Sequence, residues 1–139
     1  MRFPVRIVRQ KQAGNYAVYF PDIPEALTCG DNTEDALRQA ADALESALDF
    51  YFEDGRTIPT PSERKRGQKW ATLTPTVTAK VLLHNEMIKQ KVRPIELARR
   101  MGIPRQELTR MLNLRHKTKI DSTAAALAAL GKRLELRVA

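Results

Sequence analysis

The chain has 139 residues, with 24 Lys and Arg against 16 Asp and Glu, and it holds one cysteine. This length allows one ordinary domain or two very small ones, and a hydrophobic fraction of 42% is enough for a folded core. A single cysteine excludes an internal disulfide framework and a multi-cysteine zinc site. No apolar run reaches the roughly 18 residues of a membrane span, and charges interrupt the start, where a signal peptide is apolar, so we expect a cytoplasmic protein.

The positive charge is concentrated in the second half of the chain. Residues 1–75 hold 10 basic and 11 acidic side chains, a net charge of −1, whereas residues 76–139 hold 14 basic and 5 acidic ones, a net charge of +9. A basic module is typical of a protein that binds a polyanion, although solubility alone would also account for it. We therefore place a boundary at Pro75 and expect two domains, at residues 1–75 and 76–139.

The first half begins with the pattern of a small antiparallel sheet. Apolar residues alternate with other residues at positions 3–7 and again at 16–20, and Gly14 supplies turn chemistry between the two runs. This arrangement predicts a β-hairpin. A short third strand is expected at residues 27–29, ended by Gly30.

A helix and a fourth strand complete the first half. Asn32 is a capping residue followed by acidic residues, which favour the positive end of a helix dipole. Apolar residues between positions 37 and 52 recur at helical spacing, and Gly55 closes the segment. Residues 69–74 are short and rich in residues that favour strands, so we expect them to return to the sheet.

The second half is predicted to be helical apart from its last residues. The first helix begins at Thr76, with His84 packed on its apolar face, and the last is capped by Asp121. Leu134, Leu136 and Val138 alternate with charged residues and predict a short terminal strand. The fold class is therefore α+β. After the helix that begins at Thr76, three further helices are expected before the terminal strand, at residues 94–101, 104–112 and 122–130.

Residues 94–113 match the pattern of a helix-turn-helix. Ala98 lies where two helices must approach closely, and Gly102 occupies the turn, where a left-handed backbone is least strained without a Cβ. Pro104 can begin the second helix because its missing N–H costs nothing there. An ordinary helical hairpin is the alternative, but this spacing and the local charge favour the DNA-binding motif. Five apolar residues are placed to lock the two helices together: Leu97, Met101, Ile103, Leu108 and Met111.

The exposed face expected for the second helix of this motif carries side chains suited to reading DNA. Arginine bonds bidentately to guanine, and glutamine or asparagine to adenine, in the major groove. Nearby basic residues can bind phosphates and set the register, although residues 115–119 could also form a solvated loop. The predicted base-reading residues are Arg105, Gln106, Thr109, Arg110 and Asn113, and the predicted phosphate contacts are Arg93, Arg115, Lys117 and Lys119.

Three motifs give the chain a resemblance to a known family. They are Phe20-Pro-Asp-Ile-Pro-Glu-Ala-Leu-Thr28, Ala47-Leu-Asp-Phe-Tyr-Phe-Glu-Asp54 and the Glu96-Leu-Ala-Arg-Arg-Met-Gly102 module. With them the sequence resembles, over residues 1–138, a HicB-type antitoxin of the subgroup with a C-terminal helix-turn-helix of the Cro/repressor class. This class usually has a polar phosphate contact at the start of the first helix of the motif, where the present sequence has Arg93-Pro-Ile95.

The resemblance implies both the fold and the partners of the chain. It implies that the first domain is a partial RNase H-like domain that binds and masks a HicA-type toxin, an RNA-cleaving ribonuclease. It also implies a homo-oligomer, either a dimer or a dimer of dimers, that represses the toxin-antitoxin operon by binding double-stranded operator DNA. The alternative is a free-standing transcriptional regulator whose first domain senses a ligand or mediates assembly.

A nuclease is the third possibility for a domain of this kind. Metal-dependent phosphodiester cleavage needs several carboxylates that converge on Mg²⁺. The first strand has no acidic residue between positions 3 and 10, although an RNase H-like nuclease is expected to have a catalytic aspartate there. We therefore expect no catalytic residue, no metal site and no cofactor, and we interpret Cys29 as a small buried residue.

Two protein interfaces are also predicted. A toxin that cleaves RNA should be basic around its active site, so Asp22 and Glu25 in a proline-rich loop are candidate toxin contacts. An isolated strand is unstable alone, so Leu134, Leu136 and Val138 are expected to pair with a second copy of the chain across a two-fold axis. Such a dimer would place two reading helices on half-sites about one helical turn apart.

Overall fold

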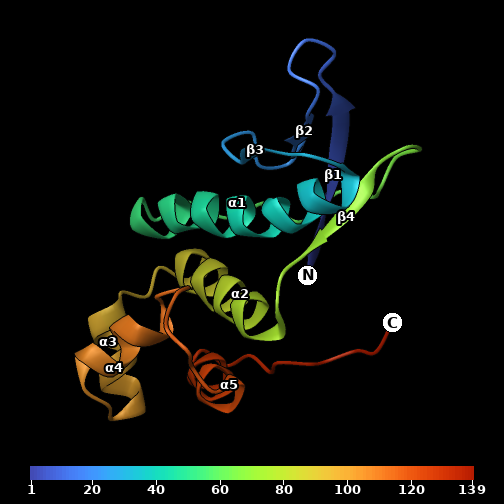
Figure 1. Ribbon diagram of the computed structural model, residues 1–139. Helices are drawn as coiled ribbons and strands as arrows, with labels where there is room; N and C mark the ends of the chain where they lie inside the picture. Colours follow the sequence, from blue (N-terminus) through green and yellow to red (C-terminus); the bar gives the residue numbers. More distant parts are fainter. The chain divides into compact units, whose positions relative to one another are not determined.

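The computed structural model describes all residues from Met1 to Ala139 and contains four strands and five helices (Figure 1). The chain divides into two compact units: residues 1–51 with 58–73 make the first, and residues 52–57 with 74–139 make the second. The first unit is a sheet with a helix and the second is built from helices, so the predicted α+β class is confirmed. None of the helices combines the length and the apolar character needed to cross a bilayer.

Four antiparallel strands form the sheet of the first unit. β1 (Arg2–Arg9) and β2 (Tyr16–Tyr19) form the predicted hairpin, while β3 (Leu27–Gly30) and β4 (Lys69–Thr72) lie at the two edges. The strand order is β3-β2-β1-β4, and α1 (Thr33–Glu53) stands between β3 and β4 in the chain. The predicted order of strand, strand, strand, helix, strand is confirmed.

One face of the sheet packs against α1. At Gly30 an added Cβ would collide with the backbone of Ala36, so the start of the helix and β3 approach more closely than any larger residue allows. Cys29 corrects a prediction: it is exposed, because its side chain lies on the opposite face of the sheet from its neighbour Gly30. The fully buried residues of this unit include Phe3, Val5 and Val18 from the sheet and Ala40, Leu44 and Leu48 from the helix.

The start of α1 has the predicted side-chain cap. Asn32 Oδ1 accepts a hydrogen bond from the backbone N–H of Asp35 at 2.8 Å. The Asp35 carboxylate in turn accepts from the backbone N–H of Asp31 at 2.9 Å and from the Arg38 guanidinium at 3.2 Å. The bond from Asp31, helped by Arg38, holds the pKa of Asp35 below its usual value. The cap therefore satisfies backbone donors that would otherwise lack a partner at the helix start.

Four helices make up the second unit: α2 (Pro75–Gln90), α3 (Pro94–Met101), α4 (Arg105–Met111) and α5 (Ile120–Ala129). All four predicted helices are present, and three of their starts differ from the prediction. α2 begins at Pro75, one residue before the predicted Thr76. Pro104 is the N-cap of α4 rather than its first helical residue. Lys119, not Asp121, is the N-cap of α5 and makes no side-chain hydrogen bond to it. Asp121 lies in the first turn instead, where its negative charge interacts favourably with the positive end of the helix dipole.

The predicted terminal strand is absent, so this part of the fold prediction was wrong for the single chain. Residues 132–139 form no regular structure. Leu134 is half-buried against the helical core, whereas Leu136 is 74% and Val138 98% exposed. The physical reason is that a strand needs a neighbour for its backbone N–H and C=O groups, and no other strand belongs to this unit.

Candidate nucleic-acid interface

The α3–α4 pair has the backbone geometry of the predicted helix-turn-helix. Gly102 ends α3 with a left-handed φ of 67°, and its N–H donates to Arg99 O at 3.1 Å. The N–H of Ile103 donates to Ala98 O at 3.1 Å, which closes the end of the helix. A residue with a Cβ would be strained at this φ, and Gly102 is therefore what allows the sharp turn between the two helices.

The helix-turn-helix is held by the apolar residues that the sequence pattern indicated. Ala98 is 4% exposed and belongs to the helical core, as expected where a neighbouring helix approaches closely. This core also includes Leu83 of α2 and Leu127 of α5, so α4 is fixed from several sides. All five predicted locking residues pack here, with Leu97, Leu108 and Met111 buried and Met101 and Ile103 half-buried.

The predicted base-reading residues are all exposed, and four of them lie on α4 itself. Thr109 Oγ1 donates to Arg105 O at 3.0 Å, so its hydroxyl proton is used within the helix. Asn113 lies two residues beyond the end of α4, and its Oδ1 accepts from the backbone N–H of Arg115 at 2.9 Å. This bond shapes the turn after the helix, which gives Asn113 a structural role that the sequence did not reveal.

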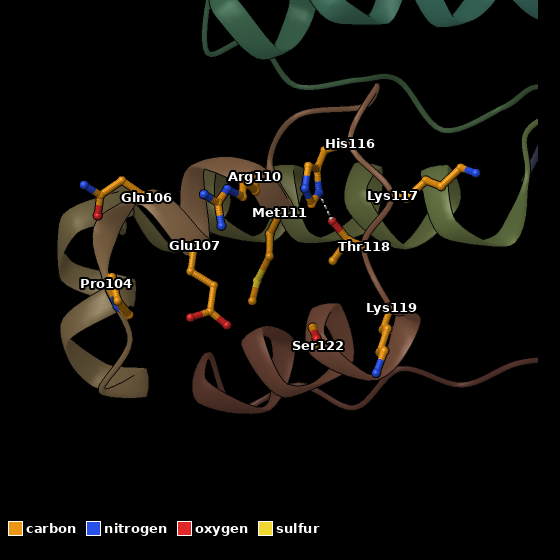
Figure 2. Close-up of a pocket in the computed structure, with 10 residues that line it drawn as sticks. All are labelled: Pro104, Gln106, Glu107, Arg110, Met111, His116, Lys117, Thr118, Lys119 and Ser122. Carbon is orange, nitrogen blue, oxygen red and sulfur yellow. Dashed lines mark hydrogen bonds between the residues drawn. The ribbon is translucent and has the colours of Figure 1, made fainter.

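A hollow of about 520 Å³ lies between α4, the loop after it and the start of α5 (Figure 2). Gln106 and Arg110 border it from α4, while Lys117 and Lys119 border it from the loop. Two predicted base-reading residues and two predicted phosphate contacts are thus brought together around one concave surface. The other residues around it are Pro104, Glu107, Met111, His116, Thr118 and Ser122, of which only Glu107 is acidic.

The remaining predicted contacts lie outside this hollow. Arg93 is the N-cap of α3, is exposed and makes no capping hydrogen bond with its side chain. Arg115 is exposed in the loop after α4. Arg105 and Thr109 are exposed on α4 but do not border the hollow. The structure therefore divides the predicted DNA contacts into those that border the hollow and those that lie outside it.

A buried lysine that sequence reasoning missed supports the end of α4. Lys80 of α2 is 0% exposed, and its Nζ donates to Asn113 O at 2.6 Å, to His116 O at 2.6 Å and to Arg110 O at 3.3 Å. Burial lowers the pKa of Lys80 below its ordinary value. The signal in the sequence was its position on the apolar stripe of α2, three residues after Val77 and four before His84.

His84 is the packed histidine that the helical pattern predicted. Its side chain is 7% exposed, stacks on Phe52 with ring centroids 4.1 Å apart and hydrogen-bonds through Nε2 to Arg56 O at 2.7 Å. Burial lowers the pKa of His84 below its ordinary value of 6.5, and the bond to the Arg56 carbonyl opposes this in part. No group of three or more His, Cys, Asp and Glu side chains could hold a metal ion.

The two candidate toxin contacts already have partners within the first unit. Asp22 Oδ2 accepts from the backbone N–H of Ser62 at 2.8 Å, and its Oδ1 accepts from the Ser62 hydroxyl. Glu25 Oε2 accepts from Tyr51 OH at 2.8 Å. Glu25 is exposed and Asp22 half-buried, so both carboxylates present charge at the surface while they tie the proline-rich loop to distant segments.

Comparison with known proteins shows the family. Residues 2–82 match the family model described as HicB-like antitoxin of bacterial toxin-antitoxin systems. The chain is 51% identical over 136 residues to Antitoxin HicB 2 of Photorhabdus laumondii, covering 98% of this chain and 95% of that one. It is 46% identical to Antitoxin HicB of Escherichia coli K12, covering 98% of both chains. The chain belongs to the HicB antitoxin family.

This membership confirms the family resemblance found in the sequence, and it decides between the antitoxin and the nuclease. The chain is a HicB antitoxin of a HicA/HicB toxin-antitoxin system, and it is not an enzyme. Antitoxin HicB 1 of Photorhabdus laumondii is a further relative of similar extent, with 46% identity over 138 residues. The match extends through the helix-turn-helix, since these relatives cover nearly the full chain.

Proposed function

We propose that the chain binds and inhibits a HicA-type RNA-cleaving toxin through its first unit and represses its own operon through its second. The observation that carries the DNA-binding part is the hollow in Figure 2, which Gln106 and Arg110 share with Lys117 and Lys119. Base-edge readers and phosphate contacts need this proximity, because one side chain must reach into the groove while its neighbours touch the backbone beside it. The net charge of +9 over residues 76–139 also supports DNA binding by the second unit.

In this proposal α4 enters the major groove of operator DNA. Arg105, Gln106, Thr109 and Arg110 face the base edges, and Asn113 stands at the end of the same surface. The loop cations and Arg93 at the start of α3 contact phosphates on either side of the groove. Arg93 thereby takes the place of the polar residue usual in the repressor class.

The active species in this proposal is a homo-oligomer, a dimer or a dimer of dimers. Leu136 and Val138 are exposed apolar residues, and they alternate with charged residues in a segment without regular structure. Pairing of this segment with its copy in a second chain supplies the missing strand neighbour and buries both side chains. The two-fold axis then relates two α4 helices, which fits a palindromic operator.

The first unit is proposed as the toxin-binding part, in line with the partial RNase H-like domain that the family resemblance implies. Its order of three strands, helix and strand supports this description. The surface carboxylates of Asp22 and Glu25 are suited to a basic partner. No nuclease chemistry is involved on the antitoxin side, because the toxin is the enzyme of the pair.

One experiment tests both parts of the proposal. The tagged chain is expressed from its native operon, purified, and its co-purified proteins and bound DNA fragments are identified by mass spectrometry and sequencing. We expect a small basic partner and fragments of the operon's own promoter. Promoter fragments without a protein partner would favour the free-standing regulator, and a protein partner without DNA would refute the repressor role.

A further inference from the structure

The near-neutral charge of the first unit conceals a strong separation of charge. Segments 1–19 and 61–72, which contain β1, β2 and β4, hold eight basic residues and one acidic residue, Glu63. Helix α1 holds six acidic residues and one basic residue, Arg38. The part of the sheet made by β1, β2 and β4 is therefore basic and α1 acidic, which a net charge of −1 for the first half does not show. The segment 20–32, which contains β3, holds Asp22, Glu25 and Asp31 and no basic residue.

The basic side coincides with a sheet face that no helix of the unit covers. The strand register places Arg2 opposite Thr72, Pro4 opposite Trp70 and Arg6 opposite Tyr19, so these side chains share the face that points away from the buried Phe3. The only helix of the unit, α1, packs on the other side. We call the surface formed by Arg2, Arg6, Tyr19 and Trp70 the open sheet face.

Two arginine–aromatic stacks form the main features of the open sheet face. The guanidinium carbon of Arg2 lies 4.2 Å from the ring centroid of Trp70, and that of Arg6 lies 4.8 Å from the ring centroid of Tyr19. Neither arginine forms an ion pair with a carboxylate. Both guanidinium groups therefore keep N–H donors and positive charge available to an anion from solution.

A hollow of about 640 Å³ adjoins the first of these stacks. It is bordered by Arg2, Trp70 and the loop segment 61–64. Arg64 in that loop is held by a hydrogen bond from Nη1 to Gln68 O at 2.9 Å, which keeps a third guanidinium at the rim. Glu63 supplies the one acidic acceptor. A flat ring, several cations and one acceptor around a hollow are suited to a nucleobase with its phosphates.

We propose that the open sheet face binds single-stranded RNA, with bases stacked on the Arg2–Trp70 and Arg6–Tyr19 pairs and phosphates held by the neighbouring basic residues. The two stacks are four residues apart on β1, about 13 Å at ~3.3 Å per residue, a span that a few nucleotides cover. Bases stack on aromatic rings and on guanidinium planes alike, and the cations neutralise the backbone.

Charge favours RNA over the toxin as the occupant of this face. The toxin expected from the family cleaves RNA and should be basic, so the basic open sheet face is not complementary to it. A duplex is a poor occupant, because its bases are already stacked on one another and offer no free ring. An RNA site on the antitoxin would lie outside the helix-turn-helix and would be independent of operator binding.

The test uses the single tryptophan of the chain, Trp70, as a reporter on the full-length protein. An RNA of about ten nucleotides and mixed sequence is titrated while indole fluorescence is recorded, and binding of the labelled RNA is followed separately by anisotropy. We expect the indole fluorescence to be quenched to a plateau. The midpoint of the quenching curve should agree with the midpoint of the anisotropy curve. A duplex DNA of the same length is expected to leave the fluorescence unchanged.

Two double variants, each of which removes two positive charges, distinguish RNA binding at the open sheet face from binding elsewhere on the protein. Arg2→Gln with Arg6→Gln is expected to weaken RNA binding by about five- to 150-fold, in the range measured for stacking residues. Arg38→Gln with Lys89→Gln removes two cations elsewhere and is expected to change RNA affinity less than twofold. Circular dichroism checks that both variants are folded.

Three results would overturn the proposal. The first is RNA binding without any change in Trp70 fluorescence, which would place the RNA elsewhere. The second is an equal loss of affinity in the two double variants. The third is quenching by the purified toxin that RNA cannot compete away, which would make the open sheet face a protein interface.

Discussion

The ammonium nitrogen of Lys80 lies 2.6 Å from the carbonyl oxygen of Asn113, although the two residues are 33 positions apart. The last carbonyls of a helix have no partners within the helix, and the dipole gives this end a partial negative charge. Lys80 meets both needs, because its three donors are directed to carbonyls at and beyond the end of α4. The proposed reading helix is thus anchored by a buried cation from α2.

Replacing Lys80 by methionine tests this anchor. Methionine keeps most of the buried stem but removes the donors, so all three carbonyl groups lose the ammonium; Arg110 O and Asn113 O keep a backbone N–H, whereas His116 O loses its Lys80 donor. We expect a loss in the free energy of unfolding of about 1–3 kcal/mol, the usual cost of buried polar groups left unpaired. Urea unfolding followed by circular dichroism measures it. Lys89→Met on the same helix is the control, since Lys89 is exposed and its replacement should change stability by less than about 0.5 kcal/mol. Equal stability of the two variants would contradict the anchor.

His84 gives stability a defined dependence on pH. Its pKa is lowered in the fold, so between that value and 6.5 the unfolded chain binds a proton that the folded chain does not. The free energy of unfolding contributed by this residue therefore rises with pH through that window and is lost as the pH falls below 6.5. The slope for one proton is at most about 1.4 kcal/mol per pH unit.

The His84→Gln variant isolates this contribution. Its amide can still donate to Arg56 O but does not titrate, so the stability difference between wild type and variant should decrease as the pH falls from 7 to 5. Thermal unfolding at several pH values measures the difference. His116→Gln, which replaces the other histidine, an exposed one, is the comparison, and a decrease confined to His84→Gln assigns the pH dependence to His84. A constant difference for His84→Gln would show that folding does not change the pKa of His84, and would contradict the lowered pKa.

Local chemistry explains which parts of the fold could be predicted from sequence. Asn32 caps α1 through a residue three positions away, and Gly102 turns the chain by its own φ of 67°, so each signal is contained in a few neighbouring residues. The alternating strands and the helix-turn-helix core follow from periodicity in the same way. These features were readable because their causes lie close together in the chain.

The features that were missed depend on distant or absent partners. Lys80 has the appearance of an ordinary helix lysine until the carbonyls of residues 110–116 are folded around it. Asn113 was expected to read bases, and its bond to the Arg115 N–H became visible only with the turn in place. The strand expected at residues 134–138 has the right alternation but no neighbour in the chain. Periodicity indicates which face is apolar, but not what will cover it.

Operator binding should separate base-reading from phosphate-binding residues. Arg110→Ala is expected to cost about 1–3 kcal/mol on the operator and much less on random DNA, because it removes a base-specific contact. Gln106→Ala should behave in the same way at a different base pair. Fluorescence anisotropy with operator and scrambled duplexes measures both. Equal losses on the two duplexes would argue against base reading.

Lys117→Ala is the counterpart for the phosphate contacts. Its loss should weaken binding to operator and random duplexes alike, and the slope of log affinity against log salt should fall by about one. Salt titrations of wild type and variant give this slope. An unchanged slope would place Lys117 outside the interface, although it borders the same hollow as Arg110.

The exposed terminal segment should control assembly. Leu136→Ser with Val138→Ser removes the two exposed apolar side chains and leaves Leu134, which packs on the helical core of its own chain. We expect sedimentation to show a shift towards smaller species with unchanged helical content. Leu27→Ser, which removes an exposed apolar side chain from β3 in the other unit, is the control. A double variant that sediments like wild type would exclude this segment as the interface.

The candidate toxin contacts can be tested without disturbing the loop that they hold. Asp22→Asn keeps one oxygen to accept from the Ser62 N–H, and its amide NH2 can donate to the Ser62 hydroxyl in place of the second carboxylate oxygen. Glu25→Gln keeps an oxygen that can accept from Tyr51 OH, so both charges are removed while the loop keeps partners. Rates of toxin association should fall and lose part of their salt dependence, because surface charges act mainly on the encounter step. Stopped-flow mixing measures these rates. Glu34→Gln with Asp42→Asn removes two exposed charges from α1 and serves as the comparison. If both pairs slow association equally, the toxin responds to the overall acidity of the unit and not to the Asp22–Glu25 loop.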